Sequence, residues 1–457
     1  MEGLLVRNQI FKKGIAFMLS LLLVASLFQP LSSVQAEESF KVNAAAAILV
    51  DSETGQILYE QNADQMLGIA SMTKMMTEYL LLEAIKEKKV SWDQEYTVSD
   101  YVYKVSQDRN LSNVPLRLGE KYNVRELYEA MTIYSANAAT IALAETIAGS
   151  EAEFVKLMNK KAKELGLEKY KFVNASGLSN KDLKGMHPSP GKPEDENMMS
   201  AKTTATLAFH LVKEYPEVLE TASVTKKKFR EGTDDETNME NWNWMLPSLV
   251  FGYEGMTGLK TGSTDFAGYC FTGTAERDGK KFISVAMNAT DEKGKGNPKA
   301  RFTETKKLLD YGFNQLDRTE VIKKGATVKG YESAPVAKGK EKQVAIRAGK
   351  ELAVYTKKGE KPNYKIKLDL KGSEIGGVEK LKAPLKKDKV VGFVTLTPQN
   401  GSELKYIADG ERKQAAVPME TAEKVEKANW FVLSMRAVGG FFSGIWTALT
   451  DTVTGWF

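Results

Sequence analysis

The sequence predicts a mixed α/β (α+β) domain with an antiparallel sheet and a central buried helix, followed by a small all-β domain and a C-terminal amphipathic helix. Three observations support this fold class. Short apolar runs joined by turns flank a long apolar stretch of helix-forming residues. A later Lys-rich segment has short strand-like runs separated by turns. Near the end, large apolar residues recur at steps of three and four.

The first 36 residues have the pattern of a secretory signal peptide. Its basic residues are Arg7, Lys12 and Lys13. An apolar run at 15–28 follows, and then the small-x-small sequence Val34-Gln35-Ala36. Because the run is short for a membrane-spanning helix, we expect cleavage at residue 36 in preference to an uncleaved anchor. The sequence therefore predicts an exported protein at the outer face of the cytoplasmic membrane.

Residues 37–315 have the pattern of the first, mixed domain. Apolar runs joined by turns predict hairpins, with Arg277-Asp278-Gly279 as one turn. A stretch without Gly or Pro, apolar around much of its surface, predicts the buried helix. The expected elements are strands at 44–50, 56–60, 268–276 and 280–287, a central helix at 72–85 and a closing helix at 303–313.

Two further regions follow. Residues 316–419 alternate short apolar runs with Lys, Gly and Pro turns, which is typical of a small all-β domain. In residues 420–457 an apolar stripe that includes aromatic side chains faces a polar side. Its tryptophans are Trp430, Trp446 and Trp456. This predicts a helix that lies in the membrane interface; the alternative is a helix packed on the protein's own core.

Composition restricts the possible chemistry. The 457 residues carry a formal charge of +5 without basic blocks, so nucleic-acid binding is not indicated. Cys270 is the one cysteine, which excludes an intrachain disulfide. The two histidines, His187 and His210, cannot form the usual three-ligand zinc site without carboxylate or cysteine help. We expect no metal and no cofactor, and a hydrolase of this composition would use lysine as its base.

Three short motifs occur in order along the first domain. Ser71-Met72-Thr73-Lys74 opens the central helix, where side chains three residues apart share a face. Ser135-Ala136-Asn137 separates two helical patterns, and Lys260-Thr261-Gly262 precedes a predicted hairpin. Each motif alone is weak evidence. Together they match the motif set of β-lactamases and penicillin-binding proteins, in which the S-x-x-K serine is the nucleophile.

With these motifs, the chain resembles the low-molecular-mass penicillin-binding proteins, the D-Ala-D-Ala carboxypeptidases of the penicillin-binding protein 5 type. The resemblance covers nearly the whole chain and implies a transpeptidase/β-lactamase-like fold for residues 37–315. It implies an enzyme that removes the terminal D-Ala from peptidoglycan stem peptides through an acyl-enzyme. β-Lactam antibiotics would acylate the same serine, and the helix at 420–457 would hold the enzyme on the membrane surface.

The resemblance also implies roles for individual residues. Ser71 would be the nucleophile, Lys74 its base, and Ser135 the relay of a proton to the leaving D-Ala. The implied substrate-binding residues are Asn137, Lys260, Thr261, Gly262, Ser263 and Arg301. Asn137 would bind the substrate amide, whereas Thr261 and Arg301 would bind its terminal carboxylate. Backbone N–H groups of Ser71 and Ser263 would form the oxyanion hole, and Lys260 would adjust the local field.

Two positions depart from the family pattern. Ser263 stands where members often carry histidine, and Lys202-Thr203-Thr204 stands where many carry an acidic residue. The expected oxyanion donor at Ser263 is a backbone group. The first departure therefore bears on pH behaviour, and the second on local packing, with the reaction class unchanged.

Two other functions fit parts of the pattern. A class A β-lactamase shares the motifs but deacylates through a glutamate-held water, and no E-x-x-L-N sequence occurs between Ser135 and Lys260. A non-catalytic cell-wall scaffold on the same fold is the second alternative, although the complete motifs argue against it. The sequence leaves open an endopeptidase or transpeptidase side activity, the oligomeric state, the growth-stage role, the role of the β-rich domain and the exposure of Cys270.

Overall fold

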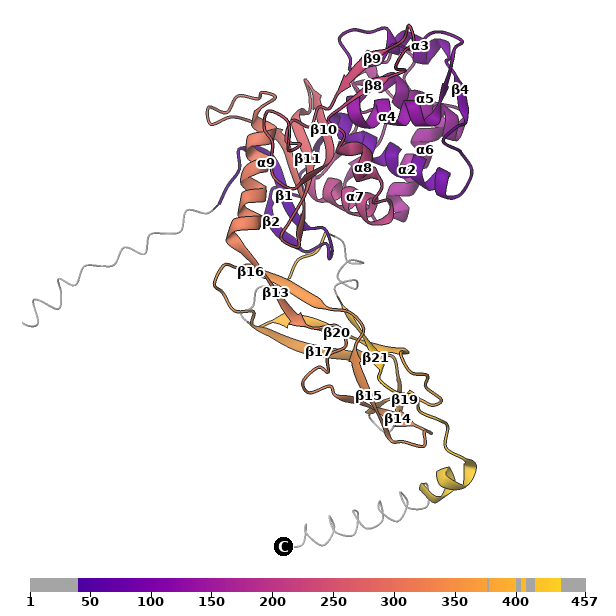
Figure 1. The fold of residues 1–457 in the computed structure, drawn as a ribbon, viewed down its shortest axis with the longest axis vertical. Helices are drawn as coiled ribbons and strands as arrows, with labels where there is room; N and C mark the ends of the chain where they lie inside the picture. Colours follow the sequence, from indigo (N-terminus) through magenta and orange to yellow (C-terminus); the bar gives the residue numbers. More distant parts are fainter. Residues whose placement is uncertain (1–39, 376–377, 400–403, 408–415, 437–457) are drawn as a thin grey trace, which may run out of the picture. The chain divides into compact units, whose positions relative to one another are not determined.

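The computed structural model describes residues 40–375, 378–399, 404–407 and 416–436 (Figure 1). The predicted signal peptide at 1–36 and most of the predicted C-terminal helix lie outside these residues. Within the described chain the predicted fold class is confirmed. A mixed α+β domain with an antiparallel sheet precedes a β-rich domain.

A five-stranded antiparallel sheet forms the frame of the first domain, with strand order β10-β11-β12-β1-β2. The strands are β1 (Ala44–Asp51), β2 (Ile57–Gln61), β10 (Met256–Thr264), β11 (Gly268–Arg277) and β12 (Lys280–Ala289). Both predicted hairpins, β1–β2 and β11–β12, are present. The strand β10, which carries Lys260-Thr261-Gly262, lies at the edge of the sheet.

Successive strand residues point to opposite sides of the sheet. Because consecutive residues of β1, β11 and β12 are buried, both faces are covered, and helices cover them. The main covering helices are α2 (Lys74–Lys86), α7 (Ala201–Glu214) and α9 (Ala300–Asp310). Ile48 of β1 packs in the cluster that contains α2 and α7, whereas its neighbour Leu49 packs with Phe302 of α9. Figure 1 shows α9 and α7 on opposite sides of the strands.

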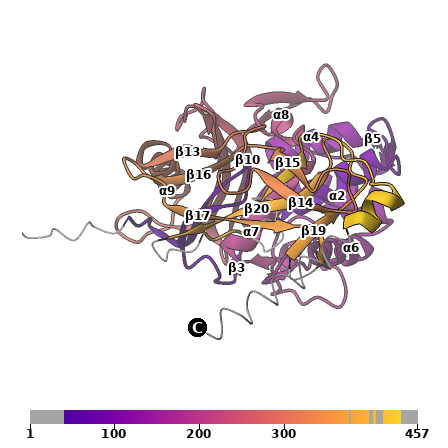
Figure 2. The same ribbon diagram turned by 90° about the horizontal axis from the view of Figure 1, so that it is seen from below.

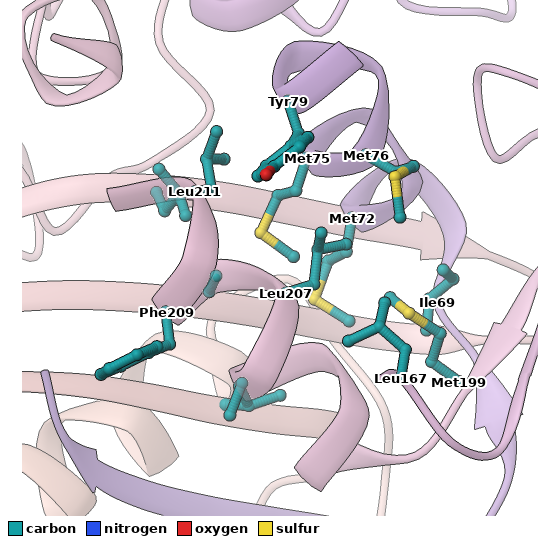
Figure 3. Close-up of a cluster of buried hydrophobic side chains, with 14 of the residues drawn as sticks. Ile69, Met72, Met75, Met76, Tyr79, Leu167, Met199, Leu207, Phe209 and Leu211 are labelled. Carbon is teal, nitrogen blue, oxygen red and sulfur yellow. The ribbon is translucent and has the colours of Figure 1, made fainter. Parts of the chain in front are cut away.

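The central helix α2 is buried over most of its surface, as predicted. A 3-10 turn, η1 (Ala70–Thr73), precedes it, so the regular helix begins only at Lys74. Figure 3 shows methionines of this segment and Leu207 of α7 in one hydrophobic cluster. Methionine is flexible and fills irregular spaces between helices. The nucleophile motif is therefore anchored in a packed core.

A second core joins three helices beside α2, which are α3 (Asp100–Ser106), α4 (Val124–Tyr134) and α5 (Asn137–Ala148). The helices α6 (Glu151–Glu164) and α8 (Val218–Ala222) pack instead in the cluster that contains the methionines of α2. The helix α4 begins with a capping box between Asn123 and Glu126, which satisfies two backbone donors at once. It ends at Ser135, and α5 starts two residues later.

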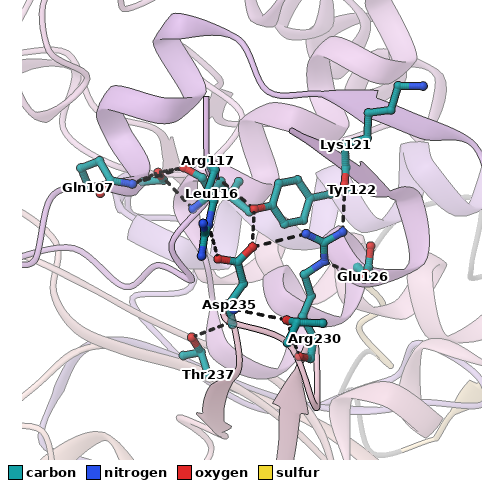
Figure 4. A network of polar contacts seen from close by, with 11 residues as sticks. Gln107, Leu116, Arg117, Lys121, Tyr122, Glu126, Arg230, Asp235 and Thr237 are labelled. Atoms are coloured by element: carbon teal, nitrogen blue, oxygen red, sulfur yellow. Dashed lines mark hydrogen bonds and ion pairs between the residues drawn. The ribbon is translucent and has the colours of Figure 1, made fainter. Parts of the chain in front are cut away.

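A polar network holds the hairpin of β8 (Lys226–Phe229) and β9 (Thr237–Glu240) against these helices (Figure 4). Asp235, in the hairpin turn, accepts hydrogen bonds from Arg117 Nε at 2.5 Å and from Tyr122 Oη at 3.3 Å. Arg230 Nη1 donates to the same carboxylate at 3.3 Å. The network fixes the hairpin that leads into Asn241 and Trp242.

The closing helix differs from the prediction. The sequence placed it at 303–313, with Arg301 just ahead of it. In the structure α9 starts at Ala300, so Arg301 lies in its first turn, and a π-helical turn (Tyr311–Gln315) follows. The aromatic residues at 311 and 313 continue the apolar pattern of the helix, so the sequence predicts a helix that extends to 313.

The β-rich domain contains a seven-stranded sheet with strand order β17-β20-β21-β15-β14-β19-β18 and a separate β13–β16 pair. Its strands are β13 (Leu316–Ile322), β14 (Ser333–Ala337), β15 (Gln343–Ala348), β16 (Leu352–Lys357), β17 (Tyr364–Leu370), β18 (Ser373–Ile375), β19 (Val378–Lys382), β20 (Val390–Pro398) and β21 (Val417–Thr421). Figure 2 shows β17 and β20, which pair along their length, side by side. Its core is aliphatic.

The predicted amphipathic helix starts at 420, but in the structure Glu420 and Thr421 belong to β21, and a helical segment is described only at 430–436. Trp430, Phe431 and Met435 are exposed on this segment. Within the described ranges, no helix is both long enough and apolar enough to cross a membrane.

Gly177 permits a close contact behind the turn that carries Ser71. Its φ is +84°, and a Cβ there would lie 1.9 Å from the Ala70 carbonyl oxygen. We expect Gly177→Ala to destabilise the fold, because the left-handed backbone costs about 1–2 kcal/mol for an L-residue and the overlap adds to that. Thermal unfolding measures the loss. Gly185→Ala is the matched control, since Gly185 has φ +72° but nothing within 4 Å of its Cβ position. Equal melting temperatures for the two variants would contradict the contact.

Candidate active site

Ser71 and Lys74 lie one turn apart at the start of the central helix. Lys74 Nζ is 2.9 Å from Ser71 Oγ, and the lysine side chain is fully buried. Burial, followed by the positive charge of Lys260, holds the pKa of Lys74 well below its ordinary value. A buried lysine with a lowered pKa can be neutral and act as a base.

The other contacts of Lys74 orient its lone pair. Its Nζ is 2.8 Å from Asn137 Oδ1 and 2.7 Å from the Ser176 carbonyl oxygen. Both oxygens can only accept hydrogen bonds, whereas the Ser71 hydroxyl can also donate. A neutral amine has two hydrogens and one lone pair. Because the two acceptors take the hydrogens, the lone pair faces the Ser71 hydroxyl, and the geometry suits removal of its proton.

Ser135 and Asn137 lie at the junction of α4 and α5, as the sequence indicated. Ser135 ends α4 in a left-handed conformation with φ 59°. The Ser112 carbonyl accepts hydrogen bonds from the backbone N–H of Asn137 at 2.9 Å and from its Nδ2 at 3.0 Å. These bonds fix the amide so that Oδ1 faces Lys74. Nδ2 carries a second hydrogen, which can bind a substrate carbonyl.

Lys260 forms a second serine–lysine pair on the edge strand β10. Its Nζ donates to Ser135 Oγ at 2.9 Å and to the Thr261 carbonyl at 3.3 Å. Both side chains of the pair are buried. Burial lowers the pKa of Lys260 to about 8, although the carboxylate of Glu78 acts in the opposite direction. Lys260 can therefore stay cationic near neutral pH and exchange a proton with Ser135.

Gly262 lies where β10 meets the turn that precedes α2. In the structure a Cβ at Gly262 would lie 2.6 Å from the Ile69 carbonyl oxygen and 3.1 Å from the Ser71 nitrogen. The glycine thus lets β10 approach the backbone of the turn that carries Ser71. Ser263 follows on the same strand and is exposed.

Arg301 reaches the same strand from the first turn of α9. It is 4% exposed, and its Nη1 donates to the Gly262 carbonyl at 3.4 Å. Its buried Nε has no hydrogen-bond partner, and no acidic side chain of the described chain pairs with it. Burial lowers the pKa of this guanidinium to about 10. A buried cation with an open donor is suited to bind an incoming carboxylate.

Two protein-family models match most of this chain. Residues 32–291 match the peptidase S11 family, described as D-alanyl-D-alanine carboxypeptidase, and residues 317–427 match the C-terminal domain of penicillin-binding protein 5. The chain belongs to the peptidase S11 family. The D-alanyl-D-alanine carboxypeptidase DacF of Bacillus subtilis is 32% identical over 87% of this chain and 89% of that protein. The D-alanyl-D-alanine carboxypeptidase DacC of Escherichia coli is 31% identical over 94% of both.

Solved structures are similar as well. A peptidoglycan synthesis regulatory factor (PBP3) from Streptococcus pneumoniae is 34% identical, with a TM-score of 0.74, over 85% of this chain and all of that one. Penicillin binding protein 5 from Haemophilus influenzae is 26% identical, with a TM-score of 0.66, over 85% of this chain and 99% of that one. The predicted family and two-domain fold class of this S11 protein are thereby confirmed.

Sequence reasoning missed three contributors to the S11 site. The Ser176 carbonyl that contacts Lys74 comes from an irregular segment that no motif marks. Ala70, directly before Ser71, has φ 46°, an unusual conformation for a residue other than glycine. Glu78 is 1% exposed within α2. For Glu78 a sequence signal exists, because a carboxylate four residues after Lys74 lies on the same side of a helix that is predicted to be buried.

The remaining chemically active residues lie elsewhere. Cys270 is buried on β11, where burial raises the pKa of its thiol to about 11. His187 lies in a loop, with Nε2 at 3.1 Å from the Gly191 carbonyl oxygen. His210 is on α7, with Nδ1 at 2.9 Å from Glu214. Neither histidine contacts Ser71, in agreement with lysine as the candidate base.

Replacing Lys74 by arginine tests the base directly. The guanidinium stays protonated, so it cannot accept the Ser71 proton. We expect Lys74→Arg to slow acylation of Ser71 by about 10²–10⁴-fold, the range for loss of a general base. Stopped-flow measurement with a chromogenic β-lactam gives the rate. Lys86→Arg, at the far end of α2, is the control and should react like the wild type. An unchanged rate in Lys74→Arg would exclude Lys74 as the base.

Proposed function

We propose that this S11 protein is a serine-type D-Ala-D-Ala carboxypeptidase that trims peptidoglycan stem peptides and is acylated by β-lactams. The observation that supports this most is the set of contacts around Lys74. Of its three hydrogen-bond partners, Ser71 alone has a proton to give. A serine activated by a neutral lysine needs neither histidine nor metal.

Acylation uses both serine–lysine pairs. Ser71 Oγ attacks the carbonyl carbon between the two D-Ala residues while Lys74 takes its proton. The developing oxyanion is held by the backbone N–H groups of Ser71 and Ser263, donors that are typically worth about 3 kcal/mol each. The C–N bond then breaks, and Ser135 passes a proton to the leaving nitrogen. Lys260 restores the proton of Ser135, to which it already donates a hydrogen bond at 2.9 Å.

Deacylation returns the enzyme to its starting state. Before this step Lys74 gives up the proton that it took from Ser71, and Lys260 regains the proton that it gave to Ser135, so Lys74 is neutral again. Water then attacks the ester carbonyl of the acyl-enzyme, and Lys74 accepts the water proton. Ser71 Oγ leaves as the ester bond breaks and takes that proton from Lys74. The products are free D-Ala and a stem peptide shortened by one residue. A bound β-lactam follows the same path, but its ring nitrogen stays attached to the acyl group.

Recognition of the free carboxylate makes the reaction that of an exopeptidase. Thr261 directly precedes Gly262 on β10, Arg301 donates to the Gly262 carbonyl, and Lys260 adds a positive charge. A carboxylate bound there would satisfy the open Nε of Arg301. The terminal D-Ala would therefore be held with its peptide bond beside Ser71.

The decisive experiment combines two substrates. The mature protein and a Ser71→Ala variant are incubated with a labelled penicillin and with a peptide ending in D-Ala-D-Ala. We expect slow turnover of the label and release of free D-Ala, both abolished in Ser71→Ala, because each needs the same nucleophile. Rapid penicillin hydrolysis without D-Ala release would indicate a β-lactamase instead. Absence of labelling would indicate a non-catalytic scaffold.

We also propose that the protein is exported and held on the outer face of the cytoplasmic membrane. The sequence pattern at 1–36 supports export. The exposed apolar side chains Trp430, Phe431 and Met435, on the last described helical turns, support an interfacial anchor. Tryptophan prefers the boundary between lipid and water because its ring is apolar and its N–H is polar.

A truncation tests the anchor. Mature protein that ends at Ala428 should stay in the supernatant when membranes are sedimented, because the apolar stripe is gone. The full mature chain should pellet with them. Penicillin labelling of both forms provides the control for an intact catalytic domain. If the truncated protein still pellets, another part of the chain binds the membrane.

A further inference from the structure

Glu78 is a buried carboxylate that the proposed reaction does not use. It lies on α2, four residues after Lys74, so both side chains project from the same side of the helix. Glu78 is 1% exposed, and Lys74 is fully buried. An unneutralised charge at such a depth is strongly unfavourable. The position therefore calls for an explanation.

Glu78 also connects the two helices that carry the catalytic serines. Thr132 Oγ1 on α4 donates to Glu78 Oε1 at 2.7 Å, and both groups are buried. Ser135 follows Thr132 after less than one helical turn. The carboxylate thus lies where α2, with Ser71 at its start, meets α4, with Ser135 at its end.

The buried charges can be counted. Two amines, Lys74 and Lys260, share the site with one carboxylate, Glu78, and the Arg301 guanidinium lies nearer to Lys260 and Gly262. Tyr128 of α4 is the other titratable group near Glu78, and Glu217 lies near Tyr128. With Glu78 ionised, one cationic amine is balanced and the second amine is favoured in its neutral form.

We propose that Glu78 is a positioning residue that divides the roles of the two lysines, balancing a cationic Lys260 while Lys74 stays neutral. This inference rests on the proposed function. Glu78 would therefore set the pH range in which Lys74 is neutral and Lys260 is cationic, although it does not contact the substrate.

The electrostatic response supports this role. The Glu78 carboxylate raises the pKa of both Lys74 and Lys260, against the lowering caused by burial. In turn, burial raises the pKa of Glu78 itself to about 7, while Thr132 and the two lysines act to lower it. Removing the negative charge should therefore lower the pKa of both amines together.

The test is the pH dependence of acylation by a β-lactam. In the wild type the rate should rise as Lys74 loses its proton and fall as Lys260 loses its own near pH 8. Glu78→Gln keeps an oxygen acceptor for Thr132 but removes the charge. We expect both limbs of the profile, the rise at low pH and the fall at high pH, to move to lower pH by about one unit. This is the low end of the pKa shift that a neighbouring charge causes.

Two further variants make the result interpretable. Glu83→Gln makes the same change on the same helix, where Glu83 pairs with Lys161 at 2.8 Å, and should leave the profile in place. Thr132→Val removes the hydrogen bond that favours the carboxylate form of Glu78. It should therefore shift the profile partly in the same direction, and it can be used if Glu78→Gln does not fold.

The outcomes are distinct. Limbs that move together in Glu78→Gln or Thr132→Val support the inference. A lower rate or melting temperature with unmoved limbs would show that Glu78 is only structural and would overturn it. If the wild type is not labelled at all, the proposed function fails before the inference is tested.

Discussion

The site depends on the burial of one amine. The Lys74 side chain has no solvent-exposed surface, so its neutral form is favoured, and its contacts with Asn137 and Ser176 decide where its lone pair points. For its proposed role as a base, the amine must be shielded from solvent to be neutral, and its orientation must be fixed. Both conditions require α2 to be enclosed by neighbouring elements, which explains why a short catalytic motif needs a large domain around it.

The fold meets these conditions by joining segments far apart in the chain. The turn η1 presents Ser71, the α4–α5 junction presents Ser135 and Asn137, and the edge strand β10 presents Lys260. An edge position leaves the outer side of β10 open, so an extended peptide can lie along it. Gly177 and Gly262 allow their segments to pack closely against η1, because backbone atoms of η1 occupy the space where a side chain would be.

Much of this could be predicted from sequence, and the exceptions have physical reasons. Periodicity located both hairpins, the buried helix and the β-rich region, and the spacing of three motifs identified residues that the structure brings together. The Ser176 carbonyl was invisible because a backbone contact depends on loop path and not on side-chain type. The start of α9 was misplaced since Arg301, a charged residue, does not resemble a buried helical position. Glu78 was not predicted because an acid on a helix belongs to no catalytic motif, and its burial appears only when the neighbouring elements are in place.

Cys270 gives the protein a natural reporter. It is the one cysteine of the chain, it is buried on the strand that pairs with β10, and its raised pKa keeps it as an unreactive thiol. A thiol reagent can reach it only when the sheet beside the catalytic edge opens. The rate of its modification therefore measures local opening of the sheet beside β10, without an engineered label. A ligand that stabilises the closed sheet will slow that rate.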